Sequence, residues 1–224
     1  MNFEYSILYS KRKSISIIVD RDGSVIVRAP LNIREELIDQ EIRKHKQSII
    51  SKIVHNKSFN LSSIKKEFVN GESIQFLGRN YQLYFVEDLL KGVIFDNKFF
   101  INKENKSKAK ILLKEWYIIS AKEIIIPKVR ILAKQMGINY KDILIRDLKY
   151  RWGSCTSKKT LLINWRVIKA PMFVIEYIII HELAHLIESN HSKKFWNIVM
   201  VQMPNYINAK KWLKEYGSEL EKDF

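Results

Sequence analysis

The sequence predicts an α+β fold in which a β-rich first region precedes a mainly helical second region. Short β-branched and aromatic runs, separated by Gly, Asn and Asp, occur up to about residue 104. From about residue 106, longer stretches carry apolar residues at the three- and four-residue spacing of a helix. We therefore divide the chain into a β-rich region with one helix, 1–104, and a second region, 105–224.

The β-rich region opens with a hairpin signal. Two β-branched runs, 14–20 and 24–29, are separated by Arg21-Asp22-Gly23. Pro30 ends the second run, and Asn32 is a suitable N-cap for a helix. The remaining predicted elements are a helix over 33–55, a polar connector over 56–70, and strands over 73–76, 80–86, 92–96 and 99–102.

The second region begins with a long helical pattern over 106–136. Pro127 inside it implies a kink or a break, and Gly137 is a natural C-terminal stop. Pro171 opens a further helix, because proline is common in the first turn. The other predicted elements are strands over 142–151 and 161–167, joined by a turn at 154–159, and helices near 193–202 and 207–216.

The composition is that of a globular protein. Of 224 residues 46% are apolar, and there are only seven glycines and four prolines. No apolar run approaches the roughly 18 residues needed to span a membrane, and Met1 is not followed by the features of a signal peptide. The single cysteine, Cys155, excludes an internal disulfide. These features predict a cytoplasmic protein with no membrane association.

The net charge of +15 permits two interpretations. Nucleic acid or another polyanion could be a partner. Alternatively, the lysines form a solvated surface, because they are scattered and their clusters are short, as in Lys11-Arg12-Lys13. We favour the solvated surface and keep nucleic acid as an alternative partner.

The strongest chemical signal is His181-Glu182-Leu183-Ala184-His185, an H-E-x-x-H motif. Residues four apart lie on one face of a helix, so two histidines at this spacing can hold one metal ion. The motif should arise by chance in under about one chain in a hundred of this length. The preceding residues 174–180 are mostly apolar, which predicts a buried helix where unpaired histidines and carboxylates are costly. The sequence therefore predicts a metal site.

A catalytic zinc ion takes three protein ligands and leaves one position for water. His191, ten residues after His181, is the favoured third ligand. Glu188 is the alternative, since a continuing helix would place it on the same face as His181 and His185. With His191 as ligand, Glu188 would instead orient a histidine.

Glu182 is positioned to act as general base, taking a proton from the zinc-bound water. A developing oxyanion needs a further donor. Tyr177, Arg151, Arg166 and Tyr206 are candidates that spacing cannot separate from packing or ion-pair residues. Cys155 could be a nucleophile or a ligand, but no second cysteine or adjacent histidine supports either, and we interpret it as structural.

Four ordered motifs resemble the YgjP-like family of predicted zinc metallopeptidases, which is similar to the SprT-like and WLM metalloproteases. They are Arg151-Trp152-Gly153-Ser154-Cys155, Asn164-Trp165-Arg166, His181-Glu182-Leu183-Ala184-His185-Leu186, and Asn190-His191-Ser192 with Phe195-Trp196. The resemblance implies a zincin-like metallohydrolase domain over 105–224, one zinc ion held by His181, His185 and His191, and Glu182 as catalytic acid/base. It also implies that the strand with Asn164, Trp165 and Arg166 borders the substrate cleft, where an edge strand can pair with a peptide.

Three functions are compatible with these features. The favoured one is a zinc-dependent peptidase acting on proteins or peptides. A metal-dependent hydrolase of nucleoside triphosphates is the first alternative, although the chain has no Gly-rich phosphate loop. The second is a basic nucleic-acid-binding protein with a structural zinc, which leaves Glu182 without a role.

Overall fold

The computed structural model describes residues 3–20, 23–60, 66–87, 89, 92–148 and 151–221, with the backbone alone for 55–60. The described residues form mixed sheets and helices, compatible with the predicted α+β class. The chain divides into two compact units, Met1–Ile64 and Lys65–Phe224. Within the described residues, no helix combines the length and the apolar character that a membrane span requires.

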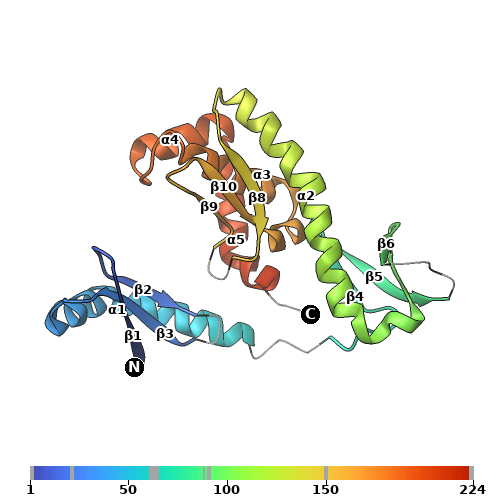
Figure 1. The fold of residues 1–224 in the computed structure, drawn as a ribbon, viewed down its shortest axis with the longest axis horizontal. Coiled ribbons are helices and arrows are strands. Elements are labelled where there is room, and N and C mark those ends of the chain that lie inside the picture. Colours follow the sequence, from blue (N-terminus) through green and yellow to red (C-terminus); the bar gives the residue numbers. More distant parts are fainter. Residues whose placement is uncertain are drawn as a thin grey trace. The chain divides into compact units, whose positions relative to one another are not determined.

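The first unit is a three-stranded sheet with one long helix (Figure 1). The predicted hairpin is confirmed, since β2 and β3 pair antiparallel; turn positions 21 and 22 lie outside the described residues. A strand that the sequence did not predict, β1, pairs parallel with β3 and makes β3 central. The elements are β1 (Tyr5–Ser10), β2 (Ser16–Val19), β3 (Val25–Pro30) and α1 (Glu35–Asn60). The core forms between alternate residues of β3, such as Val25 and Val27, and α1 residues such as Ile38 and Ile42.

The second unit begins with a four-stranded sheet in the order β4-β5-β7-β6. All four strands predicted for this part of the chain are confirmed. They are β4 (Ser73–Phe76), β5 (Arg79–Val86), β6 (Val93–Phe95) and β7 (Phe99–Asn102). The β4–β5 hairpin turns at Leu77 and Gly78, whose φ angles of 47° and 78° are those of a type I′ turn.

The β4–β5 turn is fastened to the segment that leads into the motif helix. The Leu77 amide donates to the carbonyl oxygen of Ile168 (3.0 Å), and the Gly78 amide donates to that of Lys169 (2.8 Å). A Cβ atom on Gly78 would lie 2.5 Å from Cγ of Pro171. Gly78 is therefore required both by its positive φ and by the close approach of Pro171.

The long helix α2 (Ala109–Gln135) follows a short 3-10 helix, η1 (Lys103–Lys108). It runs through Pro127 without a break. It ends where the sequence predicts, because Gly137 (φ 63°) closes a Schellman motif: its amide donates to the carbonyl oxygen of Lys134, and the Ile138 amide donates to that of Ala133. Its buried face follows a four-residue spacing through Leu113, Tyr117, Ala121, Ile125 and Val129.

The division predicted after residue 104 falls inside the second unit. The apolar face of the β4–β7 sheet, with Leu83 and Phe99, belongs to the same hydrophobic core as Leu113 and Tyr117 of α2. The sheet and the helix cannot be separated without exposing that core, so the compact unit begins before β4.

A second sheet of this unit has the order β8-β10-β9. Its strands are β8 (Asp142–Arg146), β9 (Gly153–Cys155) and β10 (Thr160–Asn164). The expectation that the turn at 154–159 joins the two long strands is wrong, because β8 and β10 run parallel and that turn instead joins β9 to β10. Positions 149 and 150, which lie between β8 and β9, are outside the described residues. After β10 the chain enters the 3-10 helix η2 (Trp165–Lys169) and does not continue as a strand.

The three C-terminal helices match the predicted ones. They are α3 (Met172–Ala184), α4 (Lys193–Gln202) and α5 (Tyr206–Glu221). Pro171 is the N-cap of α3. Because α3 packs against α2, α4, α5, β9 and β10, it is apolar on almost all sides, and the H-E-x-x-H motif lies at its buried C-terminal end.

Candidate metal centre

The last turn of α3 places His181 and His185 on one face, as the four-residue spacing predicts. Their Nε2 atoms are 3.3 Å apart. The Nε2 atom of His191 lies 3.0 Å from that of His181. The three side chains form the one histidine, cysteine or carboxylate group among the described residues whose atoms converge as metal ligands would.

A tight turn brings His191 back to the helix. α3 ends at Ala184, and the chain then closes with amides of Leu186 and Ile187 donating to carbonyl oxygens three residues earlier. α4 begins at once, because the Ser192 hydroxyl accepts a hydrogen bond from the Phe195 amide (3.3 Å) as its N-cap. His191 directly precedes this cap, so its position is fixed by the start of α4.

The donor set fits a zinc ion. Two nitrogens bound to one tetrahedral zinc ion at about 2.0–2.1 Å lie about 3.3 Å apart. The observed separations of 3.0 and 3.3 Å agree with this. Nδ1 of His185 lies 3.3 Å from the carbonyl oxygen of Glu188, an arrangement in which Nδ1–H donates and Nε2 is free to bind a metal. Nδ1 of His181 is buried and has no hydrogen-bond partner among the described residues.

His181 and His185 are held in the neutral form that metal binding requires. Burial, followed by the neighbouring histidines and Lys210, lowers the pKa of His181 to about 3. Burial and then His191 lower the pKa of His185. Both rings therefore present an uncharged nitrogen at neutral pH.

Glu182 lies on the side of α3 that faces β9, where only 6% of it is exposed. A Cβ atom on Gly153 would lie 2.5 Å from Oε1 of Glu182 and 2.6 Å from its Cγ, so the carboxylate side chain rests directly against the backbone of β9. Burial raises the pKa of Glu182 to about 7, and the positive charge of Arg151 opposes the rise. A carboxyl with a pKa near 7 is suited to accept and return a proton at neutral pH.

Aromatic rings from α3, α4 and α5 surround the histidines. Trp196 stacks on His191 with 5.7 Å between ring centroids, and Tyr206 stacks on Trp196 at 5.4 Å. Tyr177 contacts both His181 and Tyr206. Burial, followed by Tyr206 and Glu182, raises the pKa of Tyr177 to about 12, so its hydroxyl keeps its proton. Lys210 lies over Trp196 with Nζ 4.2 Å from the ring centroid.

The other residues singled out in the sequence occupy two environments. The charge of Arg151 acts on Glu182, and the charge of Glu182 acts on Tyr177, so both residues lie in the surroundings of Glu182. Asn164, Trp165 and Arg166 are buried where β10 passes into η2. Their assignment to a substrate cleft stays a prediction.

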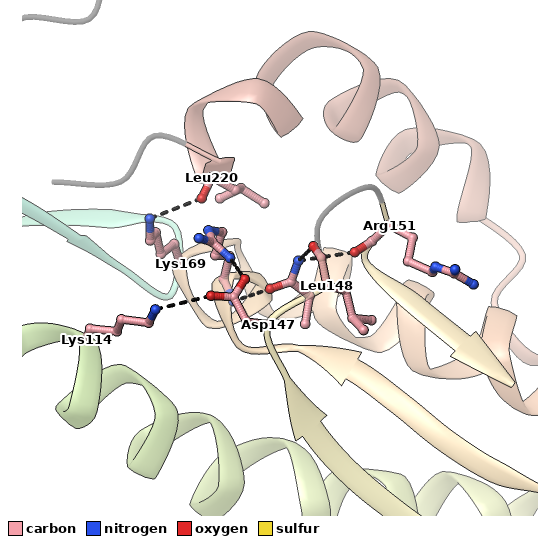
Figure 2. Close-up of polar contacts among 8 residues, drawn as sticks. Lys114, Asp147, Leu148, Arg151, Lys169 and Leu220 are labelled. Carbon is pink, nitrogen blue, oxygen red and sulfur yellow. Dashed lines mark hydrogen bonds and ion pairs between the residues drawn. The ribbon is translucent and has the colours of Figure 1, made fainter. Parts of the chain in front are cut away.

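Arg166 is held by an ion pair with Asp147, which Lys114 also contacts at 3.2 Å (Figure 2). Burial raises the pKa of Asp147, but hydrogen bonds and charge from Arg166, then the hydrogen bond from Lys114, outweigh it and hold the pKa at about 2. The pair joins the end of β8 to η2.

The low pKa of Asp147 predicts a loss of stability in acid. The ordinary pKa of aspartate is about 3.9, so the ion pair stabilises the folded protein fully above pH 4, and this contribution disappears as the pH falls toward 2. Because 46% of the Asp147 side chain is exposed, solvent screening limits the effect to about 1 kcal/mol or less. Urea unfolding between pH 6 and 2.5 should show a shallower acid decline for Asp147→Asn than for the wild type. An identical decline in both would contradict the assignment.

Two residues near the site were not singled out as functional by the sequence. Gly153 appears in the sequence only as a member of one motif, and nothing in a lone glycine reveals that a carboxylate packs on it. Lys210 follows Tyr206 by four residues on α5, which places both on one face. That spacing links Lys210 to the aromatic rings around the histidines only once Tyr206 is known to lie among them.

Comparison with known proteins identifies the family. The YgjP-like metallopeptidase domain matches residues 13–216. The crystal structure of the metallopeptidase zymogen abylysin of Pyrococcus abyssi is similar at 24% identity, over 45% of this chain and 99% of that chain, with a TM-score of 0.39. No curated protein matches the chain. Since the matched residues span most of the sequence and include the three histidines and Glu182, the chain belongs to the YgjP-like family of metallopeptidases.

Proposed function

We propose that the protein is a zinc-dependent peptidase that hydrolyses peptide bonds in proteins or peptides. The observation that carries the proposal is the convergence of three histidine Nε2 atoms beside a buried glutamate. We further propose one zinc ion, held by His181, His185 and His191, and a zincin-like arrangement whose chemistry lies within 105–224.

A bound zinc ion would supply a Lewis acid that lowers the pKa of water and polarises the substrate carbonyl group. Glu182 would take the proton of the attacking water and pass it to the leaving amine. Its contact with Gly153 limits where the carboxylate can lie. Arg151 and the Tyr177 hydroxyl are our candidates for stabilising the oxyanion that develops on the substrate.

Of the two edge strands of this sheet, β8 and β9, it is β9 that contacts Glu182 through Gly153. In the order β8-β10-β9 the strand that contains Asn164 is central, and one side of β9 remains unpaired among the described residues. We propose that an extended peptide adds to this side as a further strand, which would bring its backbone past Gly153 and the Glu182 carboxylate.

Removal of metal tests the proposal. The chain as purified, treated with a chelator and dialysed, should lose hydrolysis of fluorescein-labelled casein and regain it with one equivalent of zinc. Adding duplex DNA to this assay tests for a nucleic-acid partner. A parallel assay with nucleoside triphosphates tests the alternative of a nucleotide hydrolase. Activity that survives complete metal removal, or nucleotide hydrolysis without peptide hydrolysis, would overturn the proposal.

A further inference from the structure

Asn164 is a fully buried polar residue whose side chain uses both of its functional groups. Its Nδ2 donates to the carbonyl oxygens of Leu148 (2.8 Å) and Arg151 (3.1 Å), and its Oδ1 accepts from the Arg166 amide (3.1 Å). Its backbone amide donates to the carbonyl oxygen of Trp152 (2.8 Å). Figure 2 shows Leu148 and Arg151 converging on this point. Asn164 thus binds the carbonyl group of Leu148, which lies shortly after β8, and those of Arg151 and Trp152, which directly precede β9.

These three hydrogen bonds fix the start of β9. Gly153 follows Trp152 directly and pairs across the sheet with Ile163, the residue before Asn164. Arg166 on η2 forms an ion pair with Asp147, the residue that follows β8. Asn164 on β10 therefore holds the backbone of Arg151 and Trp152, and Gly153 follows directly.

Gly153 is the point at which β9 contacts Glu182. The backbone of Gly153 contacts the Glu182 side chain so closely that a Cβ atom would lie 2.5 Å from Oε1. Arg151 donates from Nη1 to the hydroxyl of Ser154 (3.1 Å), the residue that follows Gly153 on β9. A shift at the start of β9 would consequently move the surface against which the Glu182 carboxylate rests.

We propose that Asn164 is a positioning residue, which holds the backbone of Arg151 and Trp152 so that β9 keeps the Glu182 carboxylate in its catalytic position. This rests on the proposed function of Glu182. Asn164 touches neither the substrate nor the metal ligands in this role; it acts through Gly153. Misplacement of a catalytic group by about 1 Å can cost about 100-fold in rate, so a small change in β9 is sufficient.

The test compares Asn164→Asp with Lys169→Met in the full-length, zinc-loaded chain. Aspartate has the size of asparagine and still accepts from the Arg166 amide, but it cannot donate to the two carbonyl oxygens. Lys169→Met is the matched control, because it also removes a buried hydrogen bond. That bond runs from Nζ of Lys169 on η2 to the carbonyl oxygen of Leu220 (3.0 Å, Figure 2) and does not anchor β9. Both variants should lower the melting temperature.

We expect Asn164→Asp alone to lower kcat for a quenched fluorescent peptide by about 10-fold or more, with KM within about twofold and zinc content unchanged. In a Glu182→Gln background, Asn164→Asp should have no further effect on the residual rate, because the two residues act as one unit. Equal kcat losses in Asn164→Asp and Lys169→Met, or full additivity with Glu182→Gln, would show that Asn164 is merely structural.

Hydrogen exchange supplies a measurement that does not depend on activity. The amides of Gly153–Cys155 should exchange faster in Asn164→Asp than in Lys169→Met. If the wild type cleaves no peptide, the proposed function fails, but the hydrogen-exchange measurement still tests whether Asn164 anchors β9. Unchanged exchange at Gly153–Cys155 in Asn164→Asp would overturn that anchoring role. If Asn164→Asp does not fold, Asn164→Ser, which keeps one short donor, replaces it in both arms with the same expected directions.

Discussion

Replacing Glu182 by glutamine should lower the rate of peptide hydrolysis by about 10²–10⁴-fold, while one zinc ion per chain is retained. Glutamine has the shape of glutamate and fits against Gly153, but it cannot accept the proton of the attacking water. The measurement is kcat/KM for a defined peptide beside zinc content by atomic absorption.

Glu176→Gln is the matched control for this substitution. Glu176 lies on the same helix, α3, but forms an ion pair with Lys128 at 2.9 Å on α2. It should retain wild-type activity. A rate for Glu182→Gln within about threefold of the wild type would rule out Glu182 as the general base.

The second large effect concerns the metal ligands. His191→Ala should weaken zinc affinity by more than about 100-fold, because it removes a ligand and not merely a supporting contact. Glu188→Ala should retain zinc, since the contact with His185 is made by the Glu188 backbone carbonyl, which alanine keeps. Competition with a chromophoric chelator measures both affinities.

The pair of variants discriminates between the two candidate ligands. Loss of zinc in Glu188→Ala with retention in His191→Ala would reverse the ligand assignment. The side chain of Glu188 instead accepts from the Asn190 amide at 3.4 Å, which places it in the turn that carries His191. Removal of that contact is expected to have a smaller effect than loss of the His191 ring.

Local patterns were sufficient to predict much of the fold. The four-residue spacing of His181 and His185 follows from helix geometry. Gly137 ends α2 because of its backbone conformation, which is also local. These features depend on neighbours only a few residues away.

Features that depend on long-range pairing were missed. β9 has only three residues, including Gly153, so no alternation of side chains marks it as a strand. β1 is largely exposed, so its short run of mixed polar and apolar residues shows no buried face. Its parallel pairing with β3 therefore could not be predicted from that run. The contact between Gly153 and Glu182 joins residues far apart in the sequence, and only the folded backbone brings them together.

The turn at Leu77 and Gly78 bears on how the protein can be dissected for experiments. A fragment that starts at residue 105 would lack the two amides that cap the carbonyl oxygens of Ile168 and Lys169, and it would uncover Pro171 at the start of the motif helix. Such a fragment would expose apolar surface of α2 and would be prone to aggregate. An expression boundary placed shortly before β4 keeps these contacts. It is the boundary we recommend for isolating the unit that carries His181, His185 and His191.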